Sequence, residues 1–373
     1  MKKLKVLTIV GTRPEIIRLS VLIPKLDEHT DHVFVHTGQN NHPQLNQVFF
    51  DDLGLRQPDH YLSVDTGSMG AVMGDTIRKS EELFLMEKPD AVMILGDTNS
   101  AIAAVVAERM HIPVYHMEAG NRSFDNNVPE ELNRKMVDHV STFNLPYNDF
   151  SYNNLLREGI HPRFLSKTGS PIAEIFEQNR DGISNSSILA HLGIASDNYF
   201  LVSMHRQENV DSPRRLGRIL DTLKAVHAEW KVPIIVSTHP RTLNRLEALS
   251  RDDLIGIEFH SPFGYLDYSR LQMESKCVIS DSGTVAEEAA IMGFHAVTLR
   301  DSIERPEALE TGHIMLSAIE SGTLNEAIKL ELTLSQRVLP RGYEVNDFSN
   351  RVLTFLYSTC HLANQWLNRR AFD

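Results

Sequence analysis

The sequence predicts an α/β protein with two domains, each built around a parallel sheet. The chain has 373 residues, more than one hydrophobic core usually serves. Short apolar runs that end in turn residues alternate with longer amphipathic stretches, which is typical of repeated βα units. This pattern begins again in the second half of the chain, so two such domains facing a cleft are expected.

In the first half of the chain, each predicted strand is followed by a predicted helix. The strands are apolar runs of strand length, and the helices carry apolar residues at helical spacing. We predict strands over 4–10, 32–36, 91–95 and 114–116, and helices over 15–28, 69–86, 100–110 and 130–139.

The second half repeats the pattern after a turn. Residues 167–171, Lys-Thr-Gly-Ser-Pro, have turn composition, so we place the domain junction there, with domains over 1–168 and 169–347. A last helix from 348 to about 366, within a tail that ends at 373, is expected to cross back onto the first domain. We predict strands over 199–203, 233–237 and 277–280, and helices over 212–229, 243–249 and 285–292.

The composition is that of a soluble globular protein, with 42% hydrophobic and 23% charged residues. No apolar run reaches the roughly 18 residues of a membrane span, and no signal peptide is evident, so we expect a cytoplasmic protein without membrane contact. A net charge of -12 argues against general nucleic-acid binding but allows a local pocket for a small anion. Two cysteines, Cys277 and Cys360, are too few for a disulfide framework or a Cys-rich zinc site.

Basic residues follow the first predicted strand, at the kind of position where ligands of open α/β sheets bind. The motif Gly-Thr-Arg-Pro-Glu at 11–15 ends the strand and starts a helix. Arg13 and Arg18 could both reach an anion, and the alternative is a solvated helix start. The sequence contains neither the dinucleotide fingerprint Gly-x-Gly-x-x-Gly nor the phosphate-loop pattern, which argues against hydride transfer with a nicotinamide cofactor.

Three acidic residues follow strands or begin a helix in the first domain. Asp97 follows the strand predicted over 91–95 and Glu118 follows the next strand, so both carboxylates should face one cleft. Glu130 begins a helix after a polar loop. The structural alternatives are helix capping for Asp97 and a favourable helix-dipole interaction for Glu130. His-x-Glu at 116–118 lacks the Pro-Cys-x-x-Cys partner of a zinc deaminase, so we predict no metal site.

Candidates for phosphate and sugar binding gather at the strand ends of the second domain. The turn Ser282-Gly283-Thr284 leaves a strand and opens a helix, so its backbone amides would point at an anion, although an ordinary helix cap is the alternative. Glu288, one turn further, is placed to accept hydrogen bonds from ribose hydroxyls. The other candidates are His205 and Arg206 after one strand, His239 after another, Tyr268, for which a core role fits equally well, and Arg305.

In chain order, the motifs resemble those of the UDP-N-acetylglucosamine 2-epimerase family over nearly the whole chain. The wording of 37–40, 49–53, 56–61 and 118–122 is similar to one branch, the UDP-N-acetyl-L-fucosamine synthases. The resemblance implies two Rossmann-like domains in a GT-B-like arrangement. The shared motifs are Gly-Thr-Arg-Pro-Glu, Gly-Asp-Thr, Glu-Ala-Gly, Pro-Glu-Glu-x-Asn-Arg, His-Arg-x-Glu-Asn, Asp-Ser-Gly-x-x-x-Glu-Glu and Glu-Arg-Pro-Glu.

The resemblance also implies a reaction that needs neither a metal nor a nicotinamide. A base removes the proton at carbon 2, UDP leaves carbon 1 to give a 2-acetamidoglycal, and both return with the opposite face at carbon 2. Loss of that proton requires assisted departure of UDP, which a phosphate clamp beside carboxylates can give. Carried onto this sequence, Asp97, Glu118 and Glu130 are the acid/base candidates, His205 lies near the diphosphate and sugar, Arg13, Ser282, Gly283 and Thr284 hold the phosphates, Glu288 the ribose and Arg134 the sugar side.

The branch implies a 6-deoxy-L-sugar substrate and a homodimer. UDP-2-acetamido-2,6-dideoxy-L-talose would become UDP-N-acetyl-L-fucosamine, for capsule or O-antigen assembly. The stereochemistry at carbons 4 and 5 stays open, so UDP-N-acetyl-L-rhamnosamine and UDP-N-acetylglucosamine are alternatives, as are a hydrolysing epimerase, a glycosyltransferase and a binding regulator. Arg18, Gln207 and Thr284 depart from the lysine, arginine and glycine of better-known members, which keeps a positive charge at 18 and the helix start.

Overall fold

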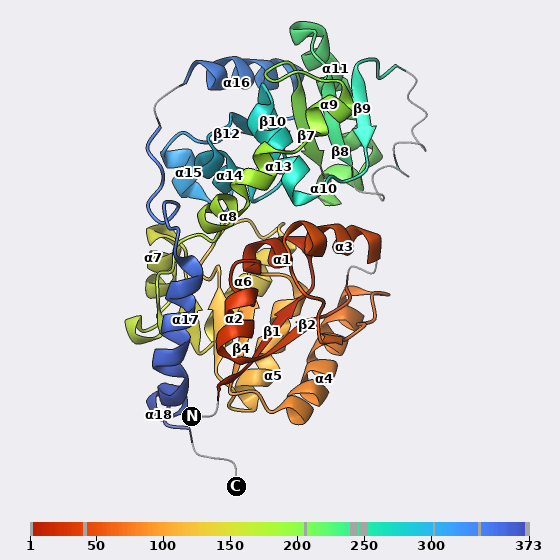
Figure 1. Cartoon of the computed structure of the whole chain (residues 1–373). Coiled ribbons are helices and arrows are strands. Elements are labelled where there is room, and N and C mark those ends of the chain that lie inside the picture. The colour runs from red at the N-terminus through yellow and green to blue at the C-terminus, as the bar shows by residue number, and fades with distance from the viewer. Residues whose placement is uncertain are drawn as a thin grey trace. The chain divides into compact units, whose positions relative to one another are not determined.

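The chain folds into two compact units, shown in Figure 1. A computed structural model describes residues 3–39, 43–204, 207–238, 245, 253–300, 303–334 and 337–369. The first unit comprises Met1–Glu177 and Arg341–Asp373, and the second comprises Gln178–Pro340. The division falls within helix α8 (Ile172–Ser184).

The first unit is built on a parallel sheet with the Rossmann strand order. Within the described residues its six strands run in the order β3-β2-β1-β4-β5-β6. The chain moves outward from β1 in one direction and restarts at β4 on the other side, so the switch point, where ligands of such sheets bind, lies between β1 and β4. The strands are β1 (Lys5–Val10), β2 (Asp31–His36), β3 (His60–Tyr61), β4 (Ala91–Leu95), β5 (Val114–Met117) and β6 (Phe143–Leu145).

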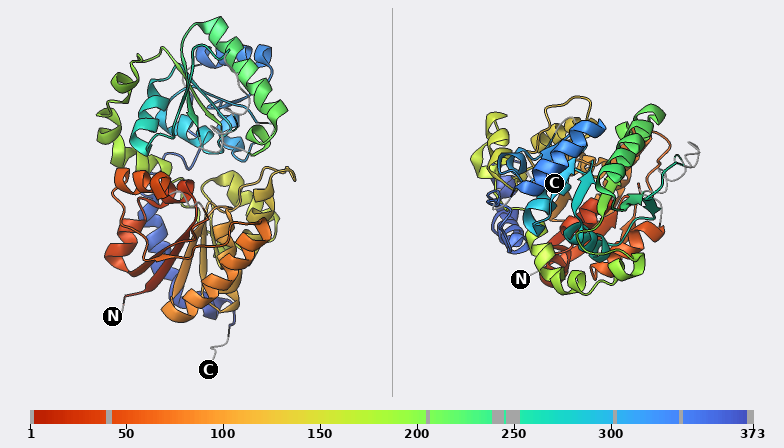
Figure 2. Two further views of the ribbon diagram at one scale, coloured as in Figure 1. Left: turned by 90° about the vertical axis from the view of Figure 1, so that its right-hand side faces the viewer. Right: turned by 90° about the horizontal axis from the view of Figure 1, so that it is seen from above.

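Helices cover both faces of this sheet (Figures 1 and 2). β4 is buried along its whole length, as expected for a central parallel strand that is covered on both sides. The helical segments are α1 (Arg13–Leu19), α2 (Ile23–His29), α3 (Pro43–Asp52), α4 (Met69–Glu87), η1 (Asn99–Ile102), α5 (Ala103–Arg109), α6 (Pro129–Val140), α7 (Asp149–Arg157) and η2 (Pro162–Phe164).

The single helix predicted over 15–28 is wrong, because the chain forms two short helices there, α1 and α2. Pro24 lies in the first turn of α2, where its missing N–H is harmless, but inside a continuous helix it would remove a hydrogen bond and clash with the preceding turn. The chain therefore turns between the helices, and the amide of Leu22 donates to the carbonyl of Leu19 at 2.9 Å.

The C-terminal helix belongs to the first unit, as predicted. Helix α17 (Phe348–Thr359) continues through η3 (Cys360–Leu362) to α18 (Ala363–Trp366). The Phe355 ring packs edge-on against Phe143 of β6, with ring centroids 5.3 Å apart. The hydroxyls of Thr359 and Tyr115 lie 2.7 Å apart in the core.

The second unit repeats the architecture, which confirms the predicted α/β class with two Rossmann-like sheets. Within the described residues its strands run in the order β12-β11-β10-β7-β8-β9, so the switch point lies between β10 and β7. The strands are β7 (Phe200–Met204), β8 (Ile234–Thr238), β9 (Ile257–His260), β10 (Cys277–Ser280), β11 (Ala296–Thr298) and β12 (Met315–Leu316). The helices are α9 (Ile188–Leu192), α10 (Gln207–Val210), α11 (Pro213–Trp230), α13 (Tyr265–Glu274), α14 (Val285–Met292), α15 (Pro306–Glu310) and α16 (Ser321–Thr333).

One predicted helix falls mostly on residues that the structure does not describe, and five short strands were not predicted. The helix predicted over 243–249 lies outside the described residues, apart from Arg245. The strands β3, β6, β9, β11 and β12 were not predicted, because each is short and lacks a long continuous apolar run. Cys277 and Cys360 are both buried, and along the described stretches no helix is long and apolar enough to cross a bilayer.

Candidate active site

The turn after β1 brings Arg13 to the switch-point edge of the first sheet. Arg13 is half-buried, and its guanidinium carbon lies 5.5 Å from the centre of the Phe49 ring. The aromatic face contacts the guanidinium in a cation–π arrangement. Arg13 therefore occupies the strand-end position that the sequence predicts for an anion-binding residue.

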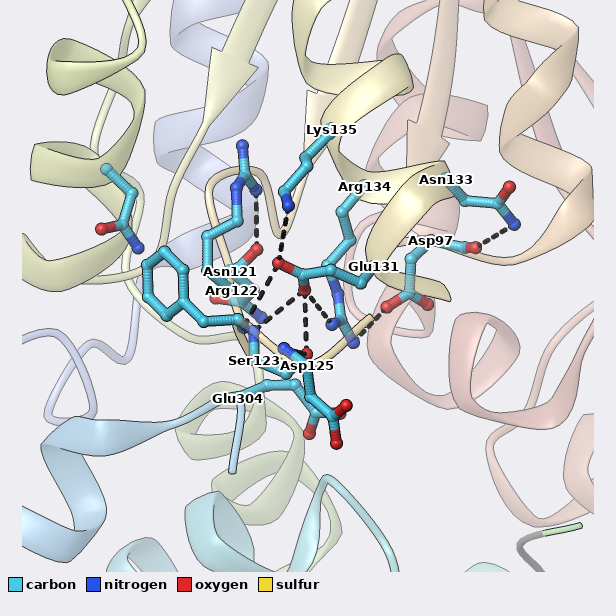
Figure 3. Close-up of polar contacts among 12 residues, drawn as sticks. Asp97, Asn121, Arg122, Ser123, Asp125, Glu131, Asn133, Arg134, Lys135 and Glu304 are labelled. Atoms are coloured by element: carbon cyan, nitrogen blue, oxygen red, sulfur yellow. Dashed lines mark hydrogen bonds and ion pairs between the residues drawn. The ribbon is translucent and has the colours of Figure 1, made fainter. Parts of the chain in front are cut away.

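The turn after β4 carries Asp97, whose carboxylate is paired with Arg134 of α6. The Oδ2 atom of Asp97 lies 2.6 Å from the Arg134 guanidinium, which is 9% exposed. Asn133 donates a hydrogen bond of 2.9 Å to the Asp97 backbone carbonyl (Figure 3). The cap of the following helical turn is Thr98, whose hydroxyl accepts from the Ser100 amide. Asp97 therefore does not serve as that cap, which was its structural alternative.

The turn after β5 carries Glu118, whose carboxylate is paired with Arg18 of α1. The Oε2 atom of Glu118 lies 2.7 Å from the Arg18 guanidinium, which is 2% exposed and lies over the Tyr147 ring. Asn121 donates to the other carboxylate oxygen at 3.2 Å. A buried guanidinium at this distance favours the charged form of the carboxylate. That Arg18 could reach an anion of the ligand stays a prediction, and the carboxylate that its guanidinium contacts is that of Glu118.

The backbone of Glu118 is strained. Its φ of 63° lies in the left-handed region, which costs an ordinary residue roughly 1–2 kcal/mol. Two glycines with positive φ frame the site, Gly96 before Asp97 and Gly120 after Glu118. A side chain at Gly120 would come within 2.3 Å of the Ser151 backbone carbonyl, so only glycine fits there. Strain of this kind persists only where the surroundings hold it, and it is frequent at functional sites.

The acidic pair at the start of α6 divides into an outer and an inner carboxylate. Glu130, the acid/base candidate, is half-buried. Glu131 is 2% exposed, accepts from the amide and hydroxyl of Ser123 at 2.9 and 3.0 Å, and lies 3.2 Å from Arg134 (Figure 3). Burial raises the pKa of Glu131, but the Ser123 hydrogen bonds and the charge of Arg134 lower it by more, so the net shift is downward. Glu131 thus ties the polar loop after Glu118 to Arg134.

Glu15 is a further buried carboxyl at this edge. Its Oε2 accepts from the Gly11 amide at 3.0 Å and from the Thr12 hydroxyl at 2.7 Å, and its Oε1 accepts from the Ser100 hydroxyl. Burial raises the pKa of Glu15 to about 7, because the hydrogen bonds from Ser100, Thr12 and Gly11 offset only part of the desolvation. The carboxyl therefore joins the turn after β1 to the helical turn that follows Asp97.

The sequence patterns indicated no role for Glu15 or Glu131. The motif Gly-Thr-Arg-Pro-Glu contains Glu15 but does not indicate which side chain its carboxyl contacts. Glu131 could have been found from its helical spacing, because it shares the buried face of α6 with Arg134 and Asp138. The partner of Glu15, Ser100, lies 85 residues away in the chain, and no local pattern indicates that pairing.

In the second unit, a turn of small polar residues follows β10 at the switch point. Ser282 and Thr284 are half-buried, and their hydroxyls lie 3.0 Å apart. The Thr284 side chain makes no capping hydrogen bond to α14, so the helix start is not closed by its own cap residue. Asp281, fully buried, turns inward and accepts from Asn209 at 2.8 Å. The Ser282 and Thr284 amides donate within the turn, to the hydroxyls of Ser280 and Ser282 at 3.0 and 3.3 Å. The turn thus places two hydroxyls and the Gly283 backbone at a helix N-terminus, where anions bind favourably.

The other candidate side chains of the second unit differ in their burial and in the residues that they contact. Glu288 is half-buried and accepts from the Gln272 side chain at 2.7 Å, which orients its carboxylate on α14. Tyr268 of α13 is also half-buried. Arg305 is 4% exposed and lies 3.1 Å from Glu287, so its charge is balanced inside the protein. The remaining candidates, His205 and Arg206 after β7 and His239 after β8, lie outside the described residues.

Comparison with known proteins gives a consistent result. A model of the family described as UDP-N-acetylglucosamine 2-epimerase matches residues 24–356. The UDP-N-acetylglucosamine 2-epimerase of Methanocaldococcus jannaschii is 37% identical over 338 residues, covering 88% of this chain and 92% of that protein. The UDP-2,3-diacetamido-2,3-dideoxy-D-glucuronate 2-epimerase of Pseudomonas aeruginosa is 32% identical over 359 residues, covering 95% of this chain and 99% of that protein.

A solved structure agrees with these sequence comparisons. The UDP-GlcNAc 2-epimerase of Methanocaldococcus jannaschii in complex with UDP-GlcNAc and UDP superposes with a TM-score of 0.89 at 35% identity, covering 95% of this chain and 100% of that chain. The strand-end carboxylates, the Rossmann sheets and these matches agree, and the chain belongs to the UDP-N-acetylglucosamine 2-epimerase family of nucleotide-sugar epimerases.

Proposed function

We propose that the protein inverts carbon 2 of a UDP-2-acetamido-6-deoxy-L-hexose by eliminating and re-adding UDP, without net hydrolysis. The reaction that we favour converts UDP-2-acetamido-2,6-dideoxy-L-talose to UDP-N-acetyl-L-fucosamine. The observation that carries the epimerisation is the occurrence of two carboxylates at neighbouring strand ends, Glu118 beside Arg18 at 2.7 Å and Asp97 beside Arg134 at 2.6 Å. The choice of sugar rests on the motif wording shared with the fucosamine synthase branch.

The chemistry requires a base that is charged before substrate binds. The base takes the proton from carbon 2, the electron pair of that C–H bond forms the double bond to carbon 1, and the C1–O bond breaks with its electrons going to UDP. Re-addition of UDP to carbon 1 and of a proton to the opposite face of carbon 2 completes the inversion. Buried guanidinium groups support the ionised form of Glu118 and Asp97, so either can act as the base. Glu130 is the third acid/base candidate.

The departing diphosphate needs its own hydrogen-bond donors. The N-terminus of α14, with Ser282, Gly283 and Thr284, supports that role because amides and hydroxyls stabilise negative charge without a proton transfer. Glu288 would accept from the ribose hydroxyls, and Arg13 would add a cation. His205, with Arg206 and His239, completes the set that we propose to contact the diphosphate and sugar.

A second substrate is supported by the relatives. The Methanocaldococcus jannaschii protein is named a UDP-N-acetylglucosamine 2-epimerase and its solved structure holds UDP-GlcNAc, which favours UDP-N-acetylglucosamine as the alternative. The Pseudomonas aeruginosa relative is named for a glucuronate sugar. Family members therefore differ in the sugar, and substrate identity has to be measured for this chain.

The test is a panel of UDP-amino-sugars in deuterated water, followed by proton NMR at carbon 2. We expect deuterium at carbon 2 and the inverted epimer with UDP-2-acetamido-2,6-dideoxy-L-talose, and near-zero free UDP at completion. Turnover of UDP-N-acetylglucosamine alone would replace the favoured substrate with the alternative. Epimerisation without deuterium entry would overturn the elimination mechanism, and stoichiometric release of UDP would indicate a hydrolysing enzyme.

We further propose that the protein works in the cytoplasm and that it is a homodimer, as the resemblance implies. Light scattering coupled to size-exclusion chromatography tests the dimer. A monomeric mass in the presence and absence of UDP would contradict it.

A further inference from the structure

A buried ionic cluster lies directly beneath the two candidate carboxylates of the first unit. It consists of His116 near the end of β5, Arg122 of the loop after β5, Asp138 of α6 and Glu158, the residue that follows α7. His116, Asp138 and Arg122 have side chains at most 1% exposed. Three charged groups in so little solvent are costly unless each is paired, and Glu158, whose side chain is 27% exposed, pairs with Arg122 at their edge. The reaction as proposed above uses none of them.

His116 contacts the turn that carries Asp97. Its Nε2 lies 2.8 Å from the backbone carbonyl of Gly96, which can accept a hydrogen bond from the ring. Gly96 immediately precedes Asp97 and has a φ of 72°. Its amide donates in turn to the Met117 carbonyl at 2.9 Å, so the two strand-end turns are already joined through the backbone. The imidazole therefore contacts Gly96, whose positive φ sets the direction in which the backbone turns toward Asp97.

Asp138 contacts the turn that carries Glu118. Its carboxylate accepts from the Gly120 amide at 3.1 and 3.2 Å, and it lies 2.7 Å from the Arg122 guanidinium. Arg122 also lies 2.5 Å from Glu158. On its other side, Asp138 lies 2.9 Å from the Nδ1 of His116. One carboxylate thus joins the histidine beneath the Asp97 turn to the glycine that follows Glu118.

We propose that His116 and Asp138 form a positioning pair that holds the turns of Asp97 and Glu118 in one fixed geometry. This inference rests on the proposed acid/base role of those two carboxylates and names residues that support them without touching substrate. Glu118 needs such support because its left-handed backbone is intrinsically unfavourable. If the cluster were released, the backbone of Glu118 could relax, and its carboxylate would move away from carbon 2.

The charge state of the pair agrees with this role. Burial lowers the pKa of His116, but the Asp138 carboxylate, 2.9 Å from Nδ1, raises it by more, so the net shift is upward from the ordinary value of 6.5. Asp138 of α6 faces the imidazole, with Arg122 and Glu158 behind it. A protonated ring carries a hydrogen on both nitrogens, so it can donate to Gly96 and face Asp138 at the same time.

Three variants separate the two contacts. His116→Gln keeps a donor that can reach toward Gly96, His116→Asn keeps one near Asp138, and Asp138→Asn removes the charge but keeps the shape. The matched control is Glu331→Gln in the second unit, where another fully buried carboxylate is paired with an arginine, Arg337, at 2.8 Å. Glu331 lies on α16 and has no part in the proposed site, so its loss should lower Tm without changing kcat.

We expect kcat to fall on the order of 10²-fold in His116→Asn and Asp138→Asn, with KM changed much less, because small displacements of a reacting group cost rate rather than binding. His116→Gln should retain more activity than His116→Asn. Values of kcat within twofold of the parent in all three variants would overturn the proposal. So would an equal loss of kcat in Glu331→Gln.

Hydrogen–deuterium exchange keeps this inference separate from the proposed function. In Asp138→Asn we expect faster amide exchange over 96–98 as well as over 118–122, because the pair couples both turns. Unchanged exchange over 96–98 would overturn the coupling even if the parent proved inactive on every sugar. If the parent is inactive but the exchange is coupled, only the proposed function fails.

Discussion

The strand-end turns of the two units carry opposite kinds of chemistry. In the first unit Asp97 and Glu118 each face a guanidinium that is almost excluded from solvent, and the Glu118 backbone is strained. In the second unit the turn before α14 offers hydroxyls and amides, and its one carboxylate, Asp281, is turned inward onto Asn209.

The difference shows how one architecture, repeated, can serve two tasks. Moving a proton needs a group that changes charge, and such a group must be held by counter-charges. Holding a diphosphate needs only oriented dipoles, which a helix start supplies. If charged side chains are essential in the first unit and neutral hydrogen-bond donors suffice in the second, substitutions of charged groups in the first unit should lower the rate more than substitutions of hydroxyls in the second.

The largest effect is expected from Asp97→Asn. Replacing an acid/base group should lower kcat by roughly 10²–10⁴-fold. The measurement is the rate of deuterium entry at carbon 2 together with epimer formation. The control is Asp75→Asn, which removes a half-buried carboxylate of α4 that is paired with Arg78. Equal turnover by Asp97→Asn and the parent would remove Asp97 from the acid/base set.

Arg18→Met should have the next largest effect. It leaves Glu118 without its buried counter-charge, so a loss of on the order of 10²-fold in kcat and a lower Tm are expected. Arg18→Lys keeps the positive charge and should restore most of the rate. If Arg18→Met lowers Tm but not kcat, the pair is structural, and the contrast between the two units loses one of its supports.

Glu15 provides a pH test within the first unit. Its pKa is raised to about 7 in the folded protein from the ordinary value of 4.5, so the folded state binds the proton more tightly than the unfolded state does. The stabilisation is complete below about pH 4.5 and is lost as pH rises toward 7, by roughly 3 kcal/mol. Denaturant unfolding of the parent and Glu15→Gln across this range measures it. Parallel stability profiles would show that Glu15 titrates normally.

The smallest effect is expected from the turn of the second unit. Ser282→Ala removes one neutral hydroxyl, which is worth about 0.5–1.5 kcal/mol, so KM should rise a few-fold with little change in kcat. Thr284→Gly, which introduces the residue of better-known family members, should be closer still to the parent. A loss of kcat comparable to that of Asp97→Asn would mean that the turn takes part in the chemistry rather than in binding.

Sequence patterns located the central strands well and the short edge strands poorly. β4 and β10 were predicted with their observed bounds because each is a continuous apolar run bounded by polar residues. β3 and β12, with two residues each, exist only because a neighbouring strand pairs with them. The break between α1 and α2 could have been predicted from Pro24, whose effect on a helix is local.

The pairings within the site could not be predicted in the same way. Arg18 and Glu118 are 100 residues apart, and Asp97 meets Arg134 through the packing of α6 beside the strand ends. The sequence predicted ligand contacts for both Arg18 and Arg134. Their contacts with Glu118 and Asp97 depend on the tertiary structure, in which the parallel strands bring these turns close together.

The sequence by itself determined the α/β class, the position of the acids at strand ends and the small polar turn before α14, because these depend on residue type and local spacing. Only the tertiary structure decided which guanidinium neutralises which carboxylate, which of Glu130 and Glu131 is buried, and that Glu118 adopts a left-handed backbone. The physical reason is that a parallel sheet brings together turns that are far apart in the chain, and the choice among possible partners then depends on packing and burial.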